Sequence, residues 1–556
     1  MMGKVIAMAA TQVTLILSGG ITPTSNHYSQ YKQVEDLSGY FAARPDVDLS
    51  VMFGSGLTPE SPVTAMPDVI KESPEGTTSF IRGEIPHNTA ATYENVDRYF
   101  NKTLAQRHWQ QGDRFVLVVS DHGSPNDLDL GCYDLKDDNK AKFTNNYSDN
   151  WISLWQPNFS AYPERDNLSV TTLKDLIHTT IPEFVPVEIV MTQCYSGGFH
   201  RLAYSLDADG FPHRDAKQAD MAVFTAISKD TTASGCTSAT EEDKYDGYER
   251  RIAEEITGRA VLSGTKLGAP KQDLLTAHQN TLLSDKTKDT PLRTSESFML
   301  DYLKALGQKD KALDEKLNDK WTLLTSPNSN LSALPSDVTK DLESRLALIV
   351  KLRAKLIEWY PEYKDQFSEM TLANIEYYAT AAELKKDEED KGVDDLRMKW
   401  RTAFYPLAQK YQDYLVKNKA KDLQAWQFEN FFFMGVTDLQ VFTRLSTEDK
   451  SLTSLAAYQN FQDDHTDIVM KWAKANLTSD DDKKNIVEAD KQYPQLQIVA
   501  NEHKQATTRA ETLAGELRRL QYQMKVAAGT LILVDQSPAT FVDFQNFMSD
   551  EWNAKI

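Results

Sequence analysis

Arg114-Phe-Val-Leu-Val-Val-Ser120 is an almost continuously apolar run, and Asp121-His122-Gly123 follows it directly. A strand that is apolar on both faces is typical of a sheet covered by helices on both sides. Further runs of this kind occupy Val13–Ser18, Leu49–Phe53, Val187–Thr192 and Met221–Ile227. Helical stretches separate them at Tyr28–Phe41, Asn95–Trp109 and Thr171–His178. This alternation predicts an α/β domain with a parallel sheet.

Beyond Tyr248 the pattern becomes almost wholly helical. Leu342, Leu346, Ile349 and Leu356, for example, recur at helical spacing. We therefore predict an α/β domain over residues 1–255, a connecting segment over 256–300, and a large all-α domain over 301–556. Two charged runs, at residues 385–392 and 479–484, predict turns between helices of this second domain.

Composition narrows the classes of function. The 556 residues carry a formal net charge of −20, which argues against nucleic acid as a partner because phosphate binding needs a basic surface. No run approaches the roughly 20 apolar residues that span a bilayer, so no membrane span is expected. The apolar run Val5–Ala10 is shorter than the core of a signal peptide. This predicts a cytoplasmic protein, with a secreted or lysosome-like compartment as the alternative if the N-terminus is a truncated signal.

Two of the expected strands end in residues that carry chemistry. His122 and Gly123 follow one strand, and Cys194 follows the next strand of this kind along the chain. Functional residues gather at the carboxyl ends of parallel strands, and sequential strands are commonly neighbours. An imidazole close to Cys194 can take its proton and make the sulfur a nucleophile. The amides of Gly123 and Cys194 would then form an oxyanion hole.

Other interpretations of these residues are open. A serine nucleophile in Cys194-Tyr-Ser-Gly-Gly198 would lack the first glycine of its motif, because Cys194 stands there. A zinc ion on His122 and Cys194 would need further ligands, and the sequence shows no spaced cluster. The chain has three cysteines, Cys132, Cys194 and Cys236, which are too few for a disulfide framework. A buried cysteine beside a turn histidine is the remaining alternative.

Two segments give the chain a family resemblance. Gly112-Asp-Arg-Phe-Val-Leu-Val-Val-Ser-Asp-His-Gly-Ser124 resembles the histidine segment of the legumain (asparaginyl endopeptidase) family, within the caspase-like clan of cysteine peptidases. Glu188-Ile-Val-Met-Thr-Gln-Cys-Tyr-Ser-Gly197 resembles the segment with the nucleophile. The resemblance covers roughly residues 13 to 250 and leaves the helical half unaccounted for.

The resemblance implies a caspase-like, three-layer domain with the activity of a cysteine endopeptidase. His122 would act as base and acid, and Cys194 would form a thioester acyl-enzyme. Asp121, Ser234 and Asp246 match positions near the substrate pocket, and Cys236 lies in the segment that follows the nucleophile strand. A turn-capping aspartate is the alternative for Asp121, and a solvated acidic loop, shared with Glu241, Glu242 and Asp243, is the alternative for Asp246. A protein or peptide is the implied substrate, and the chemistry requires no cofactor or metal.

The resemblance also bears on the helical half. Legumain-like enzymes carry a helical C-terminal segment that covers the active site until it is cleaved. By analogy, residues 301–556 are expected either to contact the site and keep the enzyme latent until they are displaced or cleaved, or to bind a target. Two alternatives stay open: a transpeptidase or ligase with the same two residues, and a catalytically silent helical binding protein. Tyr31 stands where the family has a substrate-binding arginine, and Thr192 where it has a glutamate. The preferred residue before the scissile bond is therefore left open.

Overall fold

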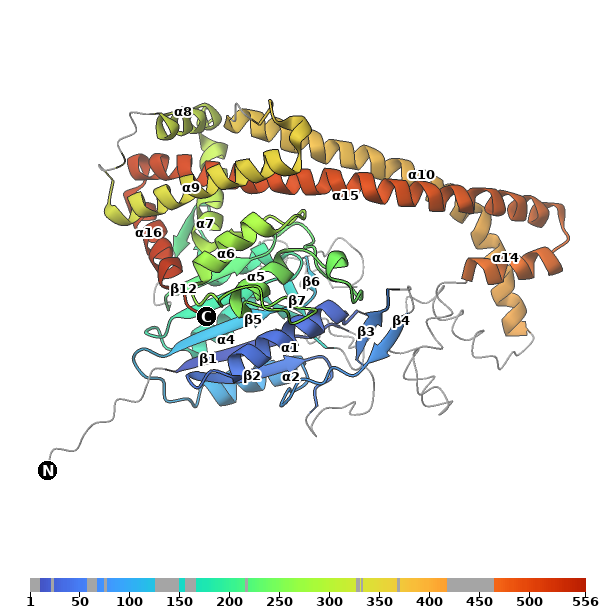
Figure 1. Ribbon diagram of the computed structural model, residues 1–556, viewed down its shortest axis with the longest axis horizontal. Coiled ribbons are helices and arrows are strands. Elements are labelled where there is room, and N and C mark those ends of the chain that lie inside the picture. The colour runs from blue at the N-terminus through green and yellow to red at the C-terminus, as the bar shows by residue number, and fades with distance from the viewer. Residues whose placement is uncertain are drawn as a thin grey trace.

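The computed structural model describes residues 11–21, 25–57, 68–74, 78–125, 150–155, 167–215, 219–326, 331, 334–367, 371–417 and 465–556. Cys132 and the N-terminal run Val5–Ala10 lie outside these ranges. Figure 1 shows an α/β part with its central sheet and, across it, the long helices α10 and α15, which lie side by side and run in opposite directions.

A six-stranded sheet forms the centre of the α/β part. Its order is β13-β12-β9-β5-β1-β2, and every pairing is parallel except that of β13 with β12. The bounds are β1 Gln12–Ser18, β2 Val47–Phe53, β5 Arg114–Val119, β9 Val187–Met191, β12 Met221–Thr225 and β13 Leu292–Arg293. The five strands expected from the sequence are thus confirmed, and β13 adds a short antiparallel edge that was not expected.

Helices cover both faces of this sheet. Val116 and Val118 of β5 pack on one side, in a cluster with residues of α1 Tyr28–Ala42, α5 Tyr248–Thr257 and α6 Leu274–Ser284. Phe115, Leu117 and Val119 pack on the other side, with α4 Val170–Thr180, the π-helical turn η1 Tyr99–Leu104 and α7 Thr294–Lys309. Alternate side chains of one strand point to opposite faces, so the apolar run of β5 fills two cores.

Smaller elements surround the sheet. The remaining strands are β3 Val69–Glu72, β4 Thr78–Ile81, β6 Gly123–Ser124, β7 Trp151–Ser153, β8 Asn167–Ser169, β10 Tyr204–Leu206 and β11 Pro212–Arg214. The short helices are α2 Tyr93–Arg98 and the 3₁₀ turns η4 Ser196–Leu202, η5 Glu242–Lys244 and η7 Pro361–Tyr363.

The C-terminal half is helical, as the sequence predicted. Its helices are α7, α8 Leu313–Thr325, α9 Ser336–Trp359, α10 Leu372–Lys417, α14 His465–Asn476, α15 Asp480–Gln536 and α16 Pro538–Asn553. The turn predicted at residues 385–392 is wrong, because α10 runs through them. A charged run can stay helical when the helix has a partner along its length, and α10 packs along α15. The turn predicted at 479–484 is confirmed only in part: the chain turns between the end of α14 at Asn476 and the N-cap Ser479, and α15 begins at Asp480.

The last helix returns to the sheet. Asp550 of α16 accepts a hydrogen bond from the Met221 amide of β12 (3.3 Å). Glu551 accepts one from the Ser295 amide of α7 (2.6 Å) and forms an ion pair with Arg293 of β13 (2.9 Å). The domain limits at 255 and 301 stay a prediction, but the central sheet and its cover include residues from both sides of them.

The structure also bears on the membrane. Within the described ranges, no helix is long and apolar enough to cross a bilayer.

Candidate active site

Two loops meet at the carboxyl edge of the sheet. β5 and β9 are parallel neighbours, and Val119 pairs with Met191. His122 and Cys194 each lie three residues beyond these paired positions, so the predicted adjacency of the two strand ends is confirmed. A Cβ atom on Gly123 would lie 1.9 Å from the carbonyl oxygen of Cys194. Only glycine therefore allows the two loops to touch.

The chain turns sharply after Cys194. Tyr195 has a φ of 58°, a left-handed conformation that a residue with a bulky side chain seldom adopts. The turn η4 follows at once. A Cβ atom on Gly197 would lie 2.7 Å from the Lys229 amide nitrogen, and one on Gly198 would lie 2.1 Å from Oδ1 of Asn150. The two glycines therefore allow close packing at this turn, Gly197 against backbone and Gly198 against a side chain.

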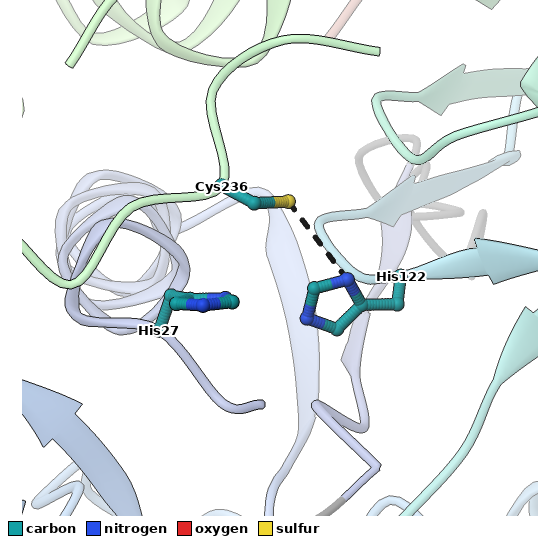
Figure 2. A group of neighbouring side chains, drawn as sticks. All are labelled: His27, His122 and Cys236. Carbon is teal, nitrogen blue, oxygen red and sulfur yellow. Dashed lines mark hydrogen bonds between the residues drawn. The ribbon is translucent and has the colours of Figure 1, made fainter. Parts of the chain in front are cut away.

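His122 is held in one tautomer. Its Nε2 lies 2.5 Å from the carbonyl oxygen of Ser25, and because a carbonyl only accepts, Nε2 carries the hydrogen. The Nδ1 atom then has a lone pair, and it lies 3.9 Å from Sγ of Cys236 (Figure 2). Burial lowers the pKa of His122, so the ring is neutral at pH 7.

The structure thus brings a second thiol to the site. Cys236 lies on the loop after β12, and its Sγ is the thiol that His122 contacts. Sγ of Cys194 makes a long contact of 3.9 Å with the carbonyl oxygen of Ala233, on the same loop. Burial raises the pKa of both thiols above the ordinary value. Both are therefore protonated at pH 7 in this arrangement.

Asp121 binds backbone amides. Its carboxylate accepts hydrogen bonds from the amides of Gly19, Gly20 (2.9 Å) and His122 (2.6 Å). Although these bonds favour the charged form, burial raises its pKa to about 7. The side chain joins the end of β1 to the end of β5, so its contacts position the loop of His122.

Ser234 and Asp246 lie on neighbouring loops, linked by a residue that the sequence did not single out. Asp289 accepts hydrogen bonds from the amides of Ser234 (2.6 Å) and Tyr248 (3.0 Å). Asp246 forms an ion pair with Arg251 (2.9 Å), which balances its charge. Asp289 follows no expected strand and lies in the segment expected only to connect domains, so no local signal marked it.

His27 is the other residue that sequence analysis missed. It lies immediately before α1, in the loop that follows β1, and its ring centroid is 5.3 Å from that of His122. Burial, and then the neighbouring His122, lower its pKa to about 4. Its place follows from the sheet order and not from the local sequence: β1 neighbours β5, and its carboxyl end opens on the same edge of the sheet.

A buried glutamate near the site predicts a dependence of stability on pH. Glu249 is 2% exposed, accepts a hydrogen bond from Ser120 Oγ (2.9 Å), and has its pKa raised by burial from 4.5 to about 8. The folded state therefore keeps a proton that the unfolded chain releases above about pH 4.5. Retention of this proton stabilises the folded state. The stabilisation is complete below about pH 4.5 and is lost as the pH rises through about 8.

We expect Glu249→Gln to remove this dependence. Between about pH 5 and 8, the wild type should lose up to about 1.4 kcal/mol of unfolding free energy per pH unit relative to the variant. Urea unfolding at several pH values measures the difference. Glu358→Gln, at an exposed position, is the matched control and should leave the profile unchanged. Parallel profiles for Glu249→Gln and the wild type would contradict the assignment.

Comparison with known proteins does not assign the chain to a family. The chain matches no protein-family model and no curated protein sequence.

Proposed function

We propose that this protein is a legumain-like cysteine endopeptidase of the caspase-like clan, with Cys194 as nucleophile and His122 as base. The observation that carries the proposal is the meeting of the two loops at the paired ends of β5 and β9, where Gly123 abuts Cys194. Adjacent loops of this kind support the proposal, because they would let an imidazole, a thiol and two backbone amides act on one carbonyl group.

The chemistry follows from these groups. Nδ1 of His122 accepts the proton of the Cys194 thiol, and the sulfur attacks the carbonyl carbon of the peptide bond. The amides of Gly123 and Cys194 stabilise the oxyanion that forms. The intermediate collapses with cleavage of the C–N bond, and the imidazolium gives its proton to the leaving amine. Water then hydrolyses the thioester, again with His122 as the base, and the thiol is restored.

Cys236 is the competing nucleophile, because its thiol contacts Nδ1 of His122. Two features favour Cys194. It lies just beyond the strand end that pairs with the strand of His122, and the left-handed residue Tyr195 after it turns the chain sharply into η4. In this proposal the sulfur of Cys194 exchanges its contact with Ala233 for one with His122 when substrate binds.

The first test is cleavage of a peptide library that varies the residue before the scissile bond. We expect cleavage by the wild type and a loss of at least about 1,000-fold in kcat/KM for Cys194→Ala. Cys236→Ala and Cys132→Ala are the matched controls and should retain cleavage. Loss of cleavage in Cys236→Ala but not in Cys194→Ala would overturn the assignment of the nucleophile. No cleavage by the wild type, before and after acid incubation or limited proteolysis, would favour the binding-protein alternative.

Two helices of the C-terminal half line a pocket next to the site. The pocket has a volume of about 380 Å³ and lies between Tyr195 and Thr231 of the α/β part and Glu383, Gly515 and Arg518 of α10 and α15. Tyr195 is the residue after the proposed nucleophile, so a substrate that reaches Cys194 from this side passes α10 and α15. We propose that these two helices restrict access of the substrate to Cys194 in the intact chain and so keep the peptidase latent. An unchanged rate of substrate cleavage after proteolytic cutting of α10 or α15 would contradict the proposed restriction of access.

The peptide cleavage assay also separates hydrolysis from transfer of the acyl group to an amine. A thioester on Cys194 can be attacked by an amine as well as by water, so the two reactions use one site. Adding an amine-bearing peptide to the cleavage reaction and analysing the products by mass spectrometry distinguishes them. A joined product that exceeds the hydrolysed one would make the protein a transpeptidase.

A further inference from the structure

Three side chains from separate loops converge beside the proposed nucleophile. His27 precedes α1, His122 follows β5, and Cys236 lies on the loop after β12 (Figure 2). One potential ligand atom of each lies within 4.8 Å of the others. Two imidazole nitrogens and one sulfur are a donor set that Zn²⁺ prefers, and three protein ligands leave the fourth position open.

The spacing is close to what a tetrahedral ion needs. Zinc bonds of about 2.0–2.3 Å place neighbouring ligand atoms about 3.3–3.8 Å apart. His122 Nδ1 and Cys236 Sγ are already 3.9 Å apart. Shifts of about an ångström or less, within the reach of side-chain rotation, would therefore bring the three ligands around an ion.

The surroundings orient two of the three ligands. Zinc-binding histidines usually donate their other N–H to a carbonyl or carboxylate, which fixes the lone pair toward the metal. His122 does this, because its Nε2 donates to the carbonyl of Ser25 (2.5 Å). On the other side, Nε2 of Gln30 lies 3.8 Å from Sγ of Cys236 and can donate to a thiolate.

We propose that His27, His122 and Cys236 form a site for a single Zn²⁺ ion, with the fourth position open to water. Binding replaces the proton of the Cys236 thiol, so one proton is released for each ion bound.

This site has a consequence that rests on the proposed function. A zinc ion on Nδ1 of His122 occupies the lone pair that the peptidase mechanism needs as its base. Zinc and catalysis therefore compete for one nitrogen, and Zn²⁺ is a reversible inhibitor of the proposed peptidase.

Metal binding is tested first, on the full chain and without any substrate. The protein is dialysed against a chelator and titrated with Zn²⁺ in competition with a chromophoric chelator. Co²⁺ then reports geometry through the absorption of tetrahedral cobalt and its thiolate charge-transfer band. We expect one equivalent and both spectral features for the wild type. Circular dichroism checks that every variant is folded.

Variants locate the site. Cys236→Ser and His27→Ala should each weaken zinc binding by at least the roughly 10–100-fold that loss of an outer partner costs. Cys194→Ser is the matched control: it removes a neighbouring thiol that is not a ligand and should bind as the wild type does. No binding by the folded wild type, or wild-type affinity in Cys236→Ser, would overturn the site.

Inhibition is measured separately, so the two proposals can fail independently. Zn²⁺ should abolish cleavage by the wild type at the concentration that fills the site, a chelator should restore it, and Cys236→Ser should need at least about tenfold more zinc. Binding without any peptidase activity would keep the zinc site and reject the peptidase. Unchanged cleavage with the site filled would reject the competition for His122.

Discussion

Replacing Arg519 of α15 with alanine should lower the free energy of unfolding by about 3–5 kcal/mol, the usual cost of leaving a buried charge without its partner. Arg519 is fully buried and forms an ion pair with Asp285 (3.0 Å) and one with Glu516 (3.2 Å). It also donates to the carbonyl oxygens of Asp285 (2.6 Å), Thr287 (2.7 Å) and Asp289. The variant removes this donor from two buried acidic side chains and three carbonyl oxygens, and Asp285 keeps only its bonds from Thr287.

Arg518 is the matched control, one position along the same helix. It pairs with Glu376 and Glu383 of α10 (2.8 Å each), whose side chains are nearly half exposed. Partly exposed pairs contribute little, about 1 kcal/mol or less each. Urea unfolding of the wild type, Arg519→Ala and Arg518→Ala measures the contrast. Equal losses in the two variants would show that burial of Arg519 does not set its contribution.

Arg519 also connects the helical half to the candidate site. It holds the loop of residues 285–289, and Asp289 of that loop binds the amides of Ser234 and Tyr248. A Cβ atom on Gly515, one turn before Arg519, would lie 2.5 Å from the carbonyl oxygen of Lys288, so helix and loop are in backbone contact. We therefore expect Arg519→Ala to disturb the site as well as the stability.

Gly123→Ala should reduce the proposed peptidase activity by at least about 100-fold, because displacement of catalytic groups by about 1 Å has effects of this size. The new methyl group would overlap the carbonyl oxygen of Cys194, at 1.9 Å. Neither loop can easily yield: β6 begins at Gly123 and is paired with β7, and Cys194 lies just beyond β9. The clash therefore separates His122 from Cys194 and deforms the oxyanion hole.

Gly39→Ala is the control for this substitution. Gly39 lies in α1, and a Cβ atom there would meet nothing within 4 Å. Alanine should stabilise that helix by up to about 1 kcal/mol and leave cleavage unchanged. Cleavage assays and thermal unfolding of both variants measure the effects. Wild-type cleavage by folded Gly123→Ala would show that the contact of the two loops is not needed for activity.

Much of the site could be predicted because its signals are local. An apolar run, a following His-Gly or Cys, and a glycine pair are each readable within ten residues, and the structure confirms the strands that carry them. The predicted roles of Asp121 and Asp246 are a different case. The sequence shows which residues stand at these positions but not what they contact. Asp121 binds three amides and Asp246 pairs with Arg251, and these partners depend on how the loops are placed in the fold.

The amino-acid sequence by itself determined the five long strands, the helices between them and the positions of His122 and Cys194, because periodicity and turn residues act over short distances. Only the tertiary structure decided which groups share the site. Sheet order brings His27 and Cys236 to His122, and α15 brings Arg519 to the 285–289 loop. These pairs are about 95 to more than 200 residues apart in the chain. Their contacts depend on how layers pack, for which neighbouring residues carry no signal.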